Sequence, residues 1–218
     1  AETHDNMRLA EKSPTWSAMR TALSALVSHN GSFGFTNGVE WFAQEKIWVH
    51  RSSGLNWGSK DNQIDLIKSL TTLLREHPAF WDDSDISELE QDDSEILMFV
   101  RRDKKLQRPV FIAINLNTEA PSTLRLNSNL LPEELVDTTI VDFFGQADSF
   151  SLAKDESDSY NMAAGQALCF GLESDLHKNS YYNRQKSLEL LLMIVLTKCK
   201  IPYTPESLQT DALELKKS

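Results

Sequence analysis

The chain has 218 residues, which is enough to bury one large hydrophobic core or two modest ones. Its 40% apolar and 25% charged residues are typical of an ordinary globular protein. The formal net charge of −10 and the pI near 5.0 disfavour a nucleic-acid-binding surface, which needs clustered lysine and arginine. The longest apolar run, residues 188–196, is interrupted by Glu189 and falls well short of the ~20 residues that a membrane span requires. We therefore expect neither nucleic acid nor a membrane as a partner.

Cys169 and Cys199 are the only cysteines, and the sequence contains no CxxC motif and no metal-ligand spacing. Two free thiols in a reducing compartment fit this usage, and one disulfide between them is the alternative. We expect a cytoplasmic protein that holds no metal and no cofactor.

Ser13 and Pro14 predict the start of a helix, because a hydroxyl caps the first turn and proline has no N–H to lose there. Apolar residues then recur on one helical face, and Gly31 follows as a stop signal. The residues of that face are Trp16, Met19, Leu23, Leu26 and Val27. The next stretch, residues 32–35, is short and apolar and contains a glycine, so it predicts a buried strand.

Residues 36–60 show no periodicity, and a loop of this length is often functional. Three of the five tryptophans lie in it among polar side chains. The notable residues are Glu40, Trp41, Trp48, His50, Arg51, Asn56 and Trp57. Aromatic rings in such a loop either stack on the faces of sugars or bases, or pin the loop to its scaffold. The residues themselves leave both interpretations open.

A second amphipathic helix is expected from near residue 59 or 61 to His77, where the following Pro78 favours an end. Residues 1–77 therefore alternate between loop, helix, strand, loop and helix, which is typical of α/β architecture. The pattern changes after Phe80-Trp81, which we interpret as a hinge.

Residues 82–173 contain a series of short strand signals separated by turns rich in Asp, Asn, Ser, Gly and Pro. Their spacing is typical of an all-β sandwich. The expected strands are residues 86–90, 96–102, 110–116, 122–126, 138–144, 150–153, 160–163 and 167–172.

A further helix is expected from Ser180 to about Lys198. It is nearly apolar all round through its middle, so it should pack on the body of the protein, on a partner or on a segment outside this sequence. Beyond Ile201 we expect a loosely held tail with a short helix near residues 211–217.

In this order, these features resemble the C-terminal part of the alpha-amylase superfamily (glycoside hydrolase family thirteen). His4-Asp5 resembles the motif at the end of the seventh barrel strand, and Gly38-Val39-Glu40 resembles the Gly-x-Glu after the eighth. The resemblance implies an α+β chain in three parts. Residues 1–80 would be the last two units of a (β/α)8 catalytic barrel, and residues 81–173 the antiparallel β-sandwich domain that trails it. Residues 174–218 would be a helical extension that the family does not cover.

The resemblance also implies a chemistry, because the family cleaves glycosidic bonds with retention, using a nucleophile and an acid/base about 5 Å apart. Asp5 would be the carboxylate that stabilises the transition state, and His4 its sugar-binding neighbour. Side chains of the loop would line neighbouring subsites, namely Trp41, Trp48, His50, Arg51 and Trp57. Thr3 departs from the asparagine that is frequent there, which removes one hydrogen bond and leaves the His-Asp pair intact.

In the family the nucleophile and the acid/base lie upstream of the His-Asp motif, and no matching motif occurs later in this chain. We therefore expect the C-terminal portion of an alpha-amylase-like hydrolase or transglycosidase, inactive alone, whose substrate is an α-glucan oligosaccharide or polysaccharide. The alternative is a non-catalytic carbohydrate-binding or structural module. Two strand-helix units cannot close a barrel, so apolar faces should pack on the β domain, on the C-terminal helix or on a second copy by self-association.

Overall fold

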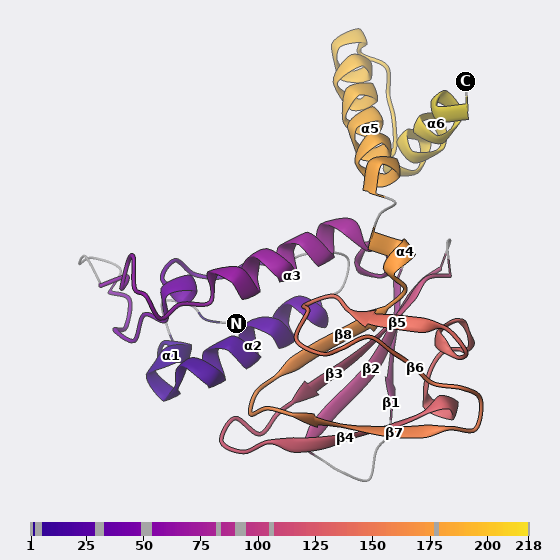
Figure 1. Cartoon of the computed structure of the whole chain (residues 1–218). Helices are drawn as coiled ribbons and strands as arrows, with labels where there is room; N and C mark the ends of the chain where they lie inside the picture. The colour runs from indigo at the N-terminus through magenta and orange to yellow at the C-terminus, as the bar shows by residue number, and fades with distance from the viewer. Residues whose placement is uncertain are drawn as a thin grey trace. The chain divides into compact units, whose positions relative to one another are not determined.

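The computed structural model describes residues 2, 6–28, 33–48, 54–81, 84–89, 95–104, 107–176 and 179–217. The chain divides into two compact units, residues 1–175 and 176–218 (Figure 1). The first unit is a mixed α/β structure with antiparallel sheets, and the second is helical. The boundary expected near residues 80 and 81 lies inside the first unit.

Two helices of this region form where the sequence predicts them, and a short helix at residues 9–12 precedes them without having been predicted. Helix α1 (Leu9–Lys12) is short, and α2 (Pro14–Leu26) begins at the predicted cap, where the Ser13 hydroxyl accepts a hydrogen bond from the Trp16 N–H at 3.0 Å. Helix α3 (Ile64–Glu76) starts a few residues later than expected and ends directly before His77, as the following proline favours. Two short 3₁₀ turns complete this region, η2 (Val39–Trp41) and η3 (Pro78–Phe80).

The strand predicted at residues 32–35 is not formed by its described part, residues 33–35. Phe35 is 41% exposed instead of buried. A strand needs a neighbouring strand to satisfy its N–H and C=O groups, and none of the described residues before Ser84 belongs to a strand. The apolar pattern is therefore present without the pairing that would make it a strand.

All eight strands predicted after residue 82 are present, with ends that differ by a few residues. Six of them form one antiparallel sheet in the order β1-β2-β3-β8-β5-β6, and the other two form the pair β4-β7. The strands are β1 (Ser84–Leu89), β2 (Ile96–Asp103), β3 (Pro109–Asn115), β4 (Ser122–Asn127), β5 (Thr139–Asp142), β6 (Phe150–Ser151), β7 (Ser157–Met162) and β8 (Ala167–Gly171).

Strand β3 is the centre of the first unit. All seven of its residues are buried. Phe111 and Ala113 belong to the core that the two sheets share, together with Leu124 of β4 and Met162 of β7. Helix α2 packs on β3 and β8, and α3 packs on α2, so helices cover part of the six-stranded sheet (Figure 1). Burial on both faces explains why successive residues of this strand are apolar.

Arg101 of β2 joins the helices to the sheet. Its side chain is fully buried and donates hydrogen bonds to four oxygens: Leu26 O and Ser28 O at 2.7 Å, Ala79 O at 2.9 Å and Ser84 Oγ at 3.1 Å. The guanidinium also lies 4.5 Å from the centroid of the Phe80 ring. Two of these oxygens are carbonyls at the C-terminal end of α2, which have no partner within the helix. Phe80, predicted as part of a hinge, is thus buried beside a hydrogen-bonded junction.

The second unit contains α5 (Asn179–Cys199) and α6 (Pro205–Lys217), and α4 (Glu173–Leu176) precedes them. Helix α6 is longer than the short helix predicted near residues 211–217. Thr204 and Ser207 explain its start, because each backbone N–H donates to the hydroxyl of the other residue. Helix α5 contacts α6, while Leu190, Leu191, Ile194 and Val195 remain exposed. None of the described helices is long and apolar enough to cross a membrane.

Cys169 is buried and Cys199 is exposed, and both thiols are free.

Candidate active site

The predicted His4-Asp5 pair lies outside the described residues, as do His50 and Arg51. Glu2, on one side of the pair, and Arg8, on the other, are described, and both are buried.

Glu2 and Arg8 form a buried ion pair. Arg8 Nε lies 3.0 Å from Glu2 Oε1, and Glu2 Oε2 accepts a hydrogen bond from the Leu9 N–H at 2.7 Å. Burial raises the pKa of the Glu2 carboxyl, and the Leu9 N–H and the Arg8 charge oppose that shift. The Glu2 carboxylate therefore caps the start of α1 through one oxygen and neutralises the Arg8 guanidinium through the other.

The same two residues attach the N-terminal segment to the loop that follows residue 35. Arg8 Nη2 donates to Asn37 O at 2.9 Å, and Arg8 Nε approaches Ala43 O at 3.4 Å. On the other side, the Thr36 hydroxyl donates to Glu2 O at 2.6 Å. Both flanks of His4-Asp5 are therefore anchored on residues 36–43, the segment that contains Gly38-Val39-Glu40.

Gly38 and Glu40 form a turn whose shape depends on both residues. Gly38 has φ +96°, and a Cβ there would overlap the Arg8 guanidinium. Glu40 Oε2 accepts a hydrogen bond from the Gly38 N–H at 2.9 Å. This hydrogen bond closes the turn.

Gln63 connects this turn to the helices. Its side-chain amide donates to Val39 O at 2.8 Å and to Ser17 Oγ at 3.1 Å, and its backbone N–H donates to Glu40 O at 3.0 Å. The turn is therefore held between α2 and the start of α3. Sequence reasoning missed Glu2, Arg8 and Gln63, because charged and amide side chains carry no pattern that distinguishes buried copies from exposed ones.

The structure brings two of the predicted loop tryptophans together. The ring centroids of Trp41 and Trp57 lie 5.4 Å apart with their planes tilted by 42°. The Asn56 amide donates to Trp41 O at 2.7 Å. Trp48 is 57% exposed, and the Lys46 ammonium lies 5.8 Å from the centroid of its ring. Within the described residues no group of three His, Cys, Asp or Glu side chains is arranged to hold a metal ion.

The comparisons with known proteins agree with this architecture at the level of fold. No family model and no curated relative matches the sequence. Several solved structures match, and two of them are similar over most of this chain. One is the gamma-CGTase from Alkalophilic bacillus clarkii, with a TM-score of 0.55, 17% identity and coverage of 74% of this chain and 24% of that chain. The other is an alpha-amylase from Malbranchea cinnamomea, with a TM-score of 0.54, 13% identity and coverage of 82% of this chain and 37% of that chain.

These similarities extend over most of this chain, which spans only 24% and 37% of the two matched chains. At sequence identities this low, the similarity shows a shared fold and not a shared activity. The relationship predicted from the sequence is confirmed at that level: this chain has the fold of part of an alpha-amylase-type protein.

Proposed function

We propose that this chain is the C-terminal part of an alpha-amylase-like enzyme that cleaves or transfers α-glucosidic bonds with retention. Residues 1–80 would belong to the end of its (β/α)8 barrel, and residues 81–173 to the β-sandwich domain that follows. The observation that supports this proposal is that Glu2 and Arg8, the described residues on either side of His4-Asp5, bond to Thr36 and Asn37, directly before Gly38-Val39-Glu40. Two motifs that follow successive barrel strands should meet at the C-terminal face of the barrel, where the active sites of such barrels lie.

In this proposal Asp5 acts on the sugar ring while other groups break the bond. A nucleophilic carboxylate attacks the anomeric carbon, and a carboxylic acid gives its proton to the departing oxygen, which leaves a covalent glycosyl-enzyme. Water or a sugar hydroxyl then displaces the enzyme carboxylate. Both of these carboxyl groups would be supplied by protein that precedes this sequence. Asp5 would accept hydrogen bonds from ring hydroxyls, and these bonds strengthen as positive charge develops on the ring.

The buried ion pair between Glu2 and Arg8 is a further support for the proposal. Glu2 and Arg8 lie two residues before and three residues after the His4-Asp5 pair, and both are fixed to the same turn. A carboxylate that stabilises a transition state must be held within a fraction of an ångström of its position. His4 would bind a hydroxyl beside Asp5. Side chains of the loop would line neighbouring subsites for the α-glucan, namely Trp41, Trp48, His50, Arg51 and Trp57.

One observation favours the second candidate function, a non-catalytic carbohydrate-binding module. Trp57 is 78% exposed, so its ring is available to a ligand without any catalytic group. The protein sequence that precedes residue 1 separates the two candidates. An aspartate at the end of one strand with an arginine nearby, and a glutamate at the end of a later strand, would support the enzyme. Their absence would support the binding module.

The direct test is turnover of maltoheptaose. Residues 1–218 alone should be inactive, and in the longer protein Asp5→Asn should lower kcat about 100-fold or more, the usual cost of removing one transition-state contact. Asp65→Asn is the matched control, because Asp65 lies on α3 with a 97% exposed side chain. Circular dichroism should show the same fold for both variants. Unchanged turnover by the Asp5 variant, or turnover by residues 1–218 alone, would contradict the proposal.

A further inference from the structure

Helix α5 leaves an apolar face uncovered within the second unit. Four side chains of its described part are 46% to 56% exposed, namely Leu190, Leu191, Ile194 and Val195. Their spacing of i, i+1, i+4 and i+5 places them on one side of the helix, where they form one contiguous patch. Single exposed apolar side chains are ordinary on a protein surface, whereas a contiguous patch marks a site of interaction. We call these four residues the apolar patch of α5.

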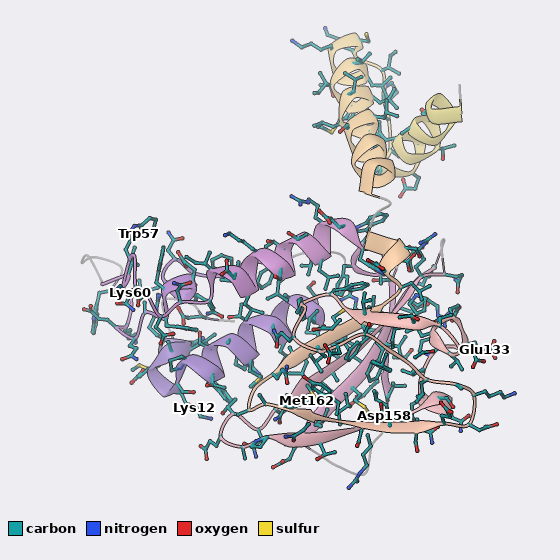
Figure 2. The ribbon with its side chains drawn as sticks, viewed as in Figure 1. Lys12, Trp57, Lys60, Glu133, Asp158 and Met162 are labelled. Atoms are coloured by element: carbon teal, nitrogen blue, oxygen red, sulfur yellow. The ribbon has the colours of Figure 1, made fainter. Side chains whose placement is uncertain are left out.

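Helix α6 does not cover this patch. The two helices contact each other, and α6 contributes the buried side chains of Leu208 and Ala212. On α5 the partly buried residues Leu188, Leu192 and Leu196 recur every four positions, on another side of the helix from the apolar patch. Figure 2 shows that side chains also project from α5 on the side turned away from α6. Helix α5 therefore has two apolar sides, and only one of them is packed.

The apolar patch has the same arrangement in both directions along α5. Its positions 190, 191, 194 and 195 lie symmetrically about a point between residues 192 and 193. The next residues on the same side are Ser187 and Lys198, which are both exposed and lie at equal distances from that point. A contact about a two-fold axis pairs each residue with its counterpart in this way. The pattern therefore fits a second copy of α5 that runs in the opposite direction.

Charge favours the antiparallel orientation of two such helices over the parallel one. Lys198 is the charged residue on this side of α5 between positions 187 and 198. A parallel pair would place the Lys198 side chains of the two copies directly opposite each other, where like charges repel. An antiparallel pair places each Lys198 opposite Ser187 of the second copy. The two ammonium groups then lie at opposite ends of a contact about 17 Å long, at a rise of about 1.5 Å per residue.

The size of the apolar patch is appropriate for a weak dimer. One pair of helices in contact over about 17 Å is at the small end of specific interfaces, so we expect a Kd in the micromolar range. A lipid surface is a poorer match. A helix that lies on a membrane exposes a polar side to water, whereas the other side of α5 carries the partly buried leucines.

We propose that the apolar patch of α5 is a dimer interface, at which two copies of this chain pair α5 against α5 in antiparallel orientation. Leu191 of one copy contacts Ile194 of the other, and Leu190 contacts Val195, about a two-fold axis between residues 192 and 193. The two pairs of α5 and α6 then form a four-helix arrangement in which both apolar sides of α5 are packed. This interface uses residues of the second unit alone, so it does not depend on the proposed enzymatic function.

The first test is sedimentation velocity of residues 1–218 over a range of concentrations. About 150 mM salt screens the repulsion between copies that each carry a net charge of −10. The wild type should convert from monomer to dimer with a Kd of about 10 µM. Leu191→Lys should raise this Kd about 10-fold or more, because it places an unpaired charge in the apolar contact.

Leu116→Lys is the matched control for this substitution. Leu116 is also an exposed leucine, but it lies in the first unit, directly after β3, so the same change there should leave the dimer Kd unaltered. Circular dichroism and thermal melting verify that both variants are folded.

Cysteine cross-linking tests the orientation of the two helices. The background is Cys199→Ser, because Cys199 is an exposed thiol. Ser187→Cys and Lys198→Cys are made in separate chains, one of which carries a tag that changes its size. Oxidation of the mixture should give a disulfide-linked dimer that contains one chain of each kind. Neither variant should cross-link alone, because identical positions lie about 17 Å apart in the antiparallel pair.

The outcomes separate this interface from its alternatives. A dimer that Leu191→Lys dissociates and Leu116→Lys preserves, with cross-links in the mixture alone, supports it whatever the turnover assay shows. A chain that stays monomeric at about 200 µM overturns it, as does a dimer that Leu191→Lys leaves intact. Cross-linking of Ser187→Cys chains with one another overturns the antiparallel orientation. Sedimentation with phosphatidylglycerol vesicles addresses lipid: a monomer that binds them, and loses this binding in Leu191→Lys, overturns the second copy in favour of a membrane surface.

Discussion

The guanidinium of Arg8 occupies the space that a side chain at Gly38 would need. The two residues lie thirty positions apart in the sequence, and the contact joins the segment after His4-Asp5 to the turn of Gly38-Val39-Glu40. Glu2, which precedes His4-Asp5 in the sequence, neutralises the same Arg8 guanidinium. The glycine is therefore required twice, once for its φ of +96° and once for the absence of a Cβ.

Gly38→Ala should destabilise the protein by about 3 kcal/mol or more, because it adds backbone strain and displaces Arg8 from Asn37 O and Glu2. Equilibrium unfolding in urea measures the change. Gly58→Ala is the matched control: it has φ +78°, but a Cβ there meets nothing within 4 Å. It should therefore cost only the conformational part, about 1 kcal/mol. Equal losses for the two variants would mean that the contact with Arg8 is unimportant.

Arg101→Met should destabilise the protein by about 3 kcal/mol or more, since it leaves the Leu26, Ser28 and Ala79 carbonyls without their donor. Arg102→Met is the control on the next position of the same strand. Arg102 pairs with Glu134 at the surface, where both side chains are about one-third exposed, so its loss should cost under about 1 kcal/mol. Urea unfolding of both variants compares them directly. Similar midpoints would argue against Arg101 as the junction between the helices and the sheet.

His77 makes stability depend on pH below neutrality. The groups that face it are Asp175, whose Oδ2 lies 3.8 Å from His77 Nε2, and Arg108, which pairs with the same carboxylate. Burial, assisted by the Arg108 charge, lowers the pKa of His77 to about 3. The nearby Asp175 does not outweigh burial, so the ring is neutral, and its Nδ1 accepts the Ala79 N–H at 3.2 Å. The ring proton is accordingly assigned to Nε2.

The sign of this dependence follows from proton binding. Between pH 6.5, the ordinary pKa of histidine, and about 3, the unfolded chain binds a proton that the folded chain excludes. Stability should therefore fall as the pH drops below 6.5, with a contribution of up to about 1.4 kcal/mol per pH unit. His77→Gln should reduce the slope of unfolding free energy between pH 7 and 5, measured in urea. Slopes that are identical in the wild type and the variant would show that His77 is protonated in the folded state.

Helix caps, prolines and apolar patterns predicted the helices and strands whose sequence signals lie within a few neighbouring residues. Ser13 and Pro14 mark the start of α2, and Pro78 explains why α3 ends before it. The apolar pattern of residues 110–116 predicts a strand, and its burial on both faces follows from the helices that cover one of them. The candidate site was predicted less completely. Its motif residues are a prediction that rests on resemblance, whereas the ion pair and the amide that hold the turn were not predicted at all.

Arg101 and Arg102 mark the limit of what a sequence can decide. They are the same residue type at adjacent positions of one strand, so strand geometry places them on opposite faces. Nothing in the chain near them says which face is covered. The tertiary structure buries Arg101 under the end of α2 and leaves Arg102 beside Glu134 at the surface.

The sequence by itself determined where most helices and strands form, because capping, proline and hydrophobic periodicity act over one or two turns. It also predicted, through a resemblance in the order of those elements and their motifs, the fold that this chain shares with part of alpha-amylase-type proteins. Only the tertiary structure decided which charges are buried, which tryptophan pins the loop and which is exposed, and that residues 33–35 form no strand. These outcomes depend on partners that lie dozens of residues away in the sequence. A charged side chain is buried only where a partner pairs with it, and a strand forms only where a neighbouring strand accepts its hydrogen bonds.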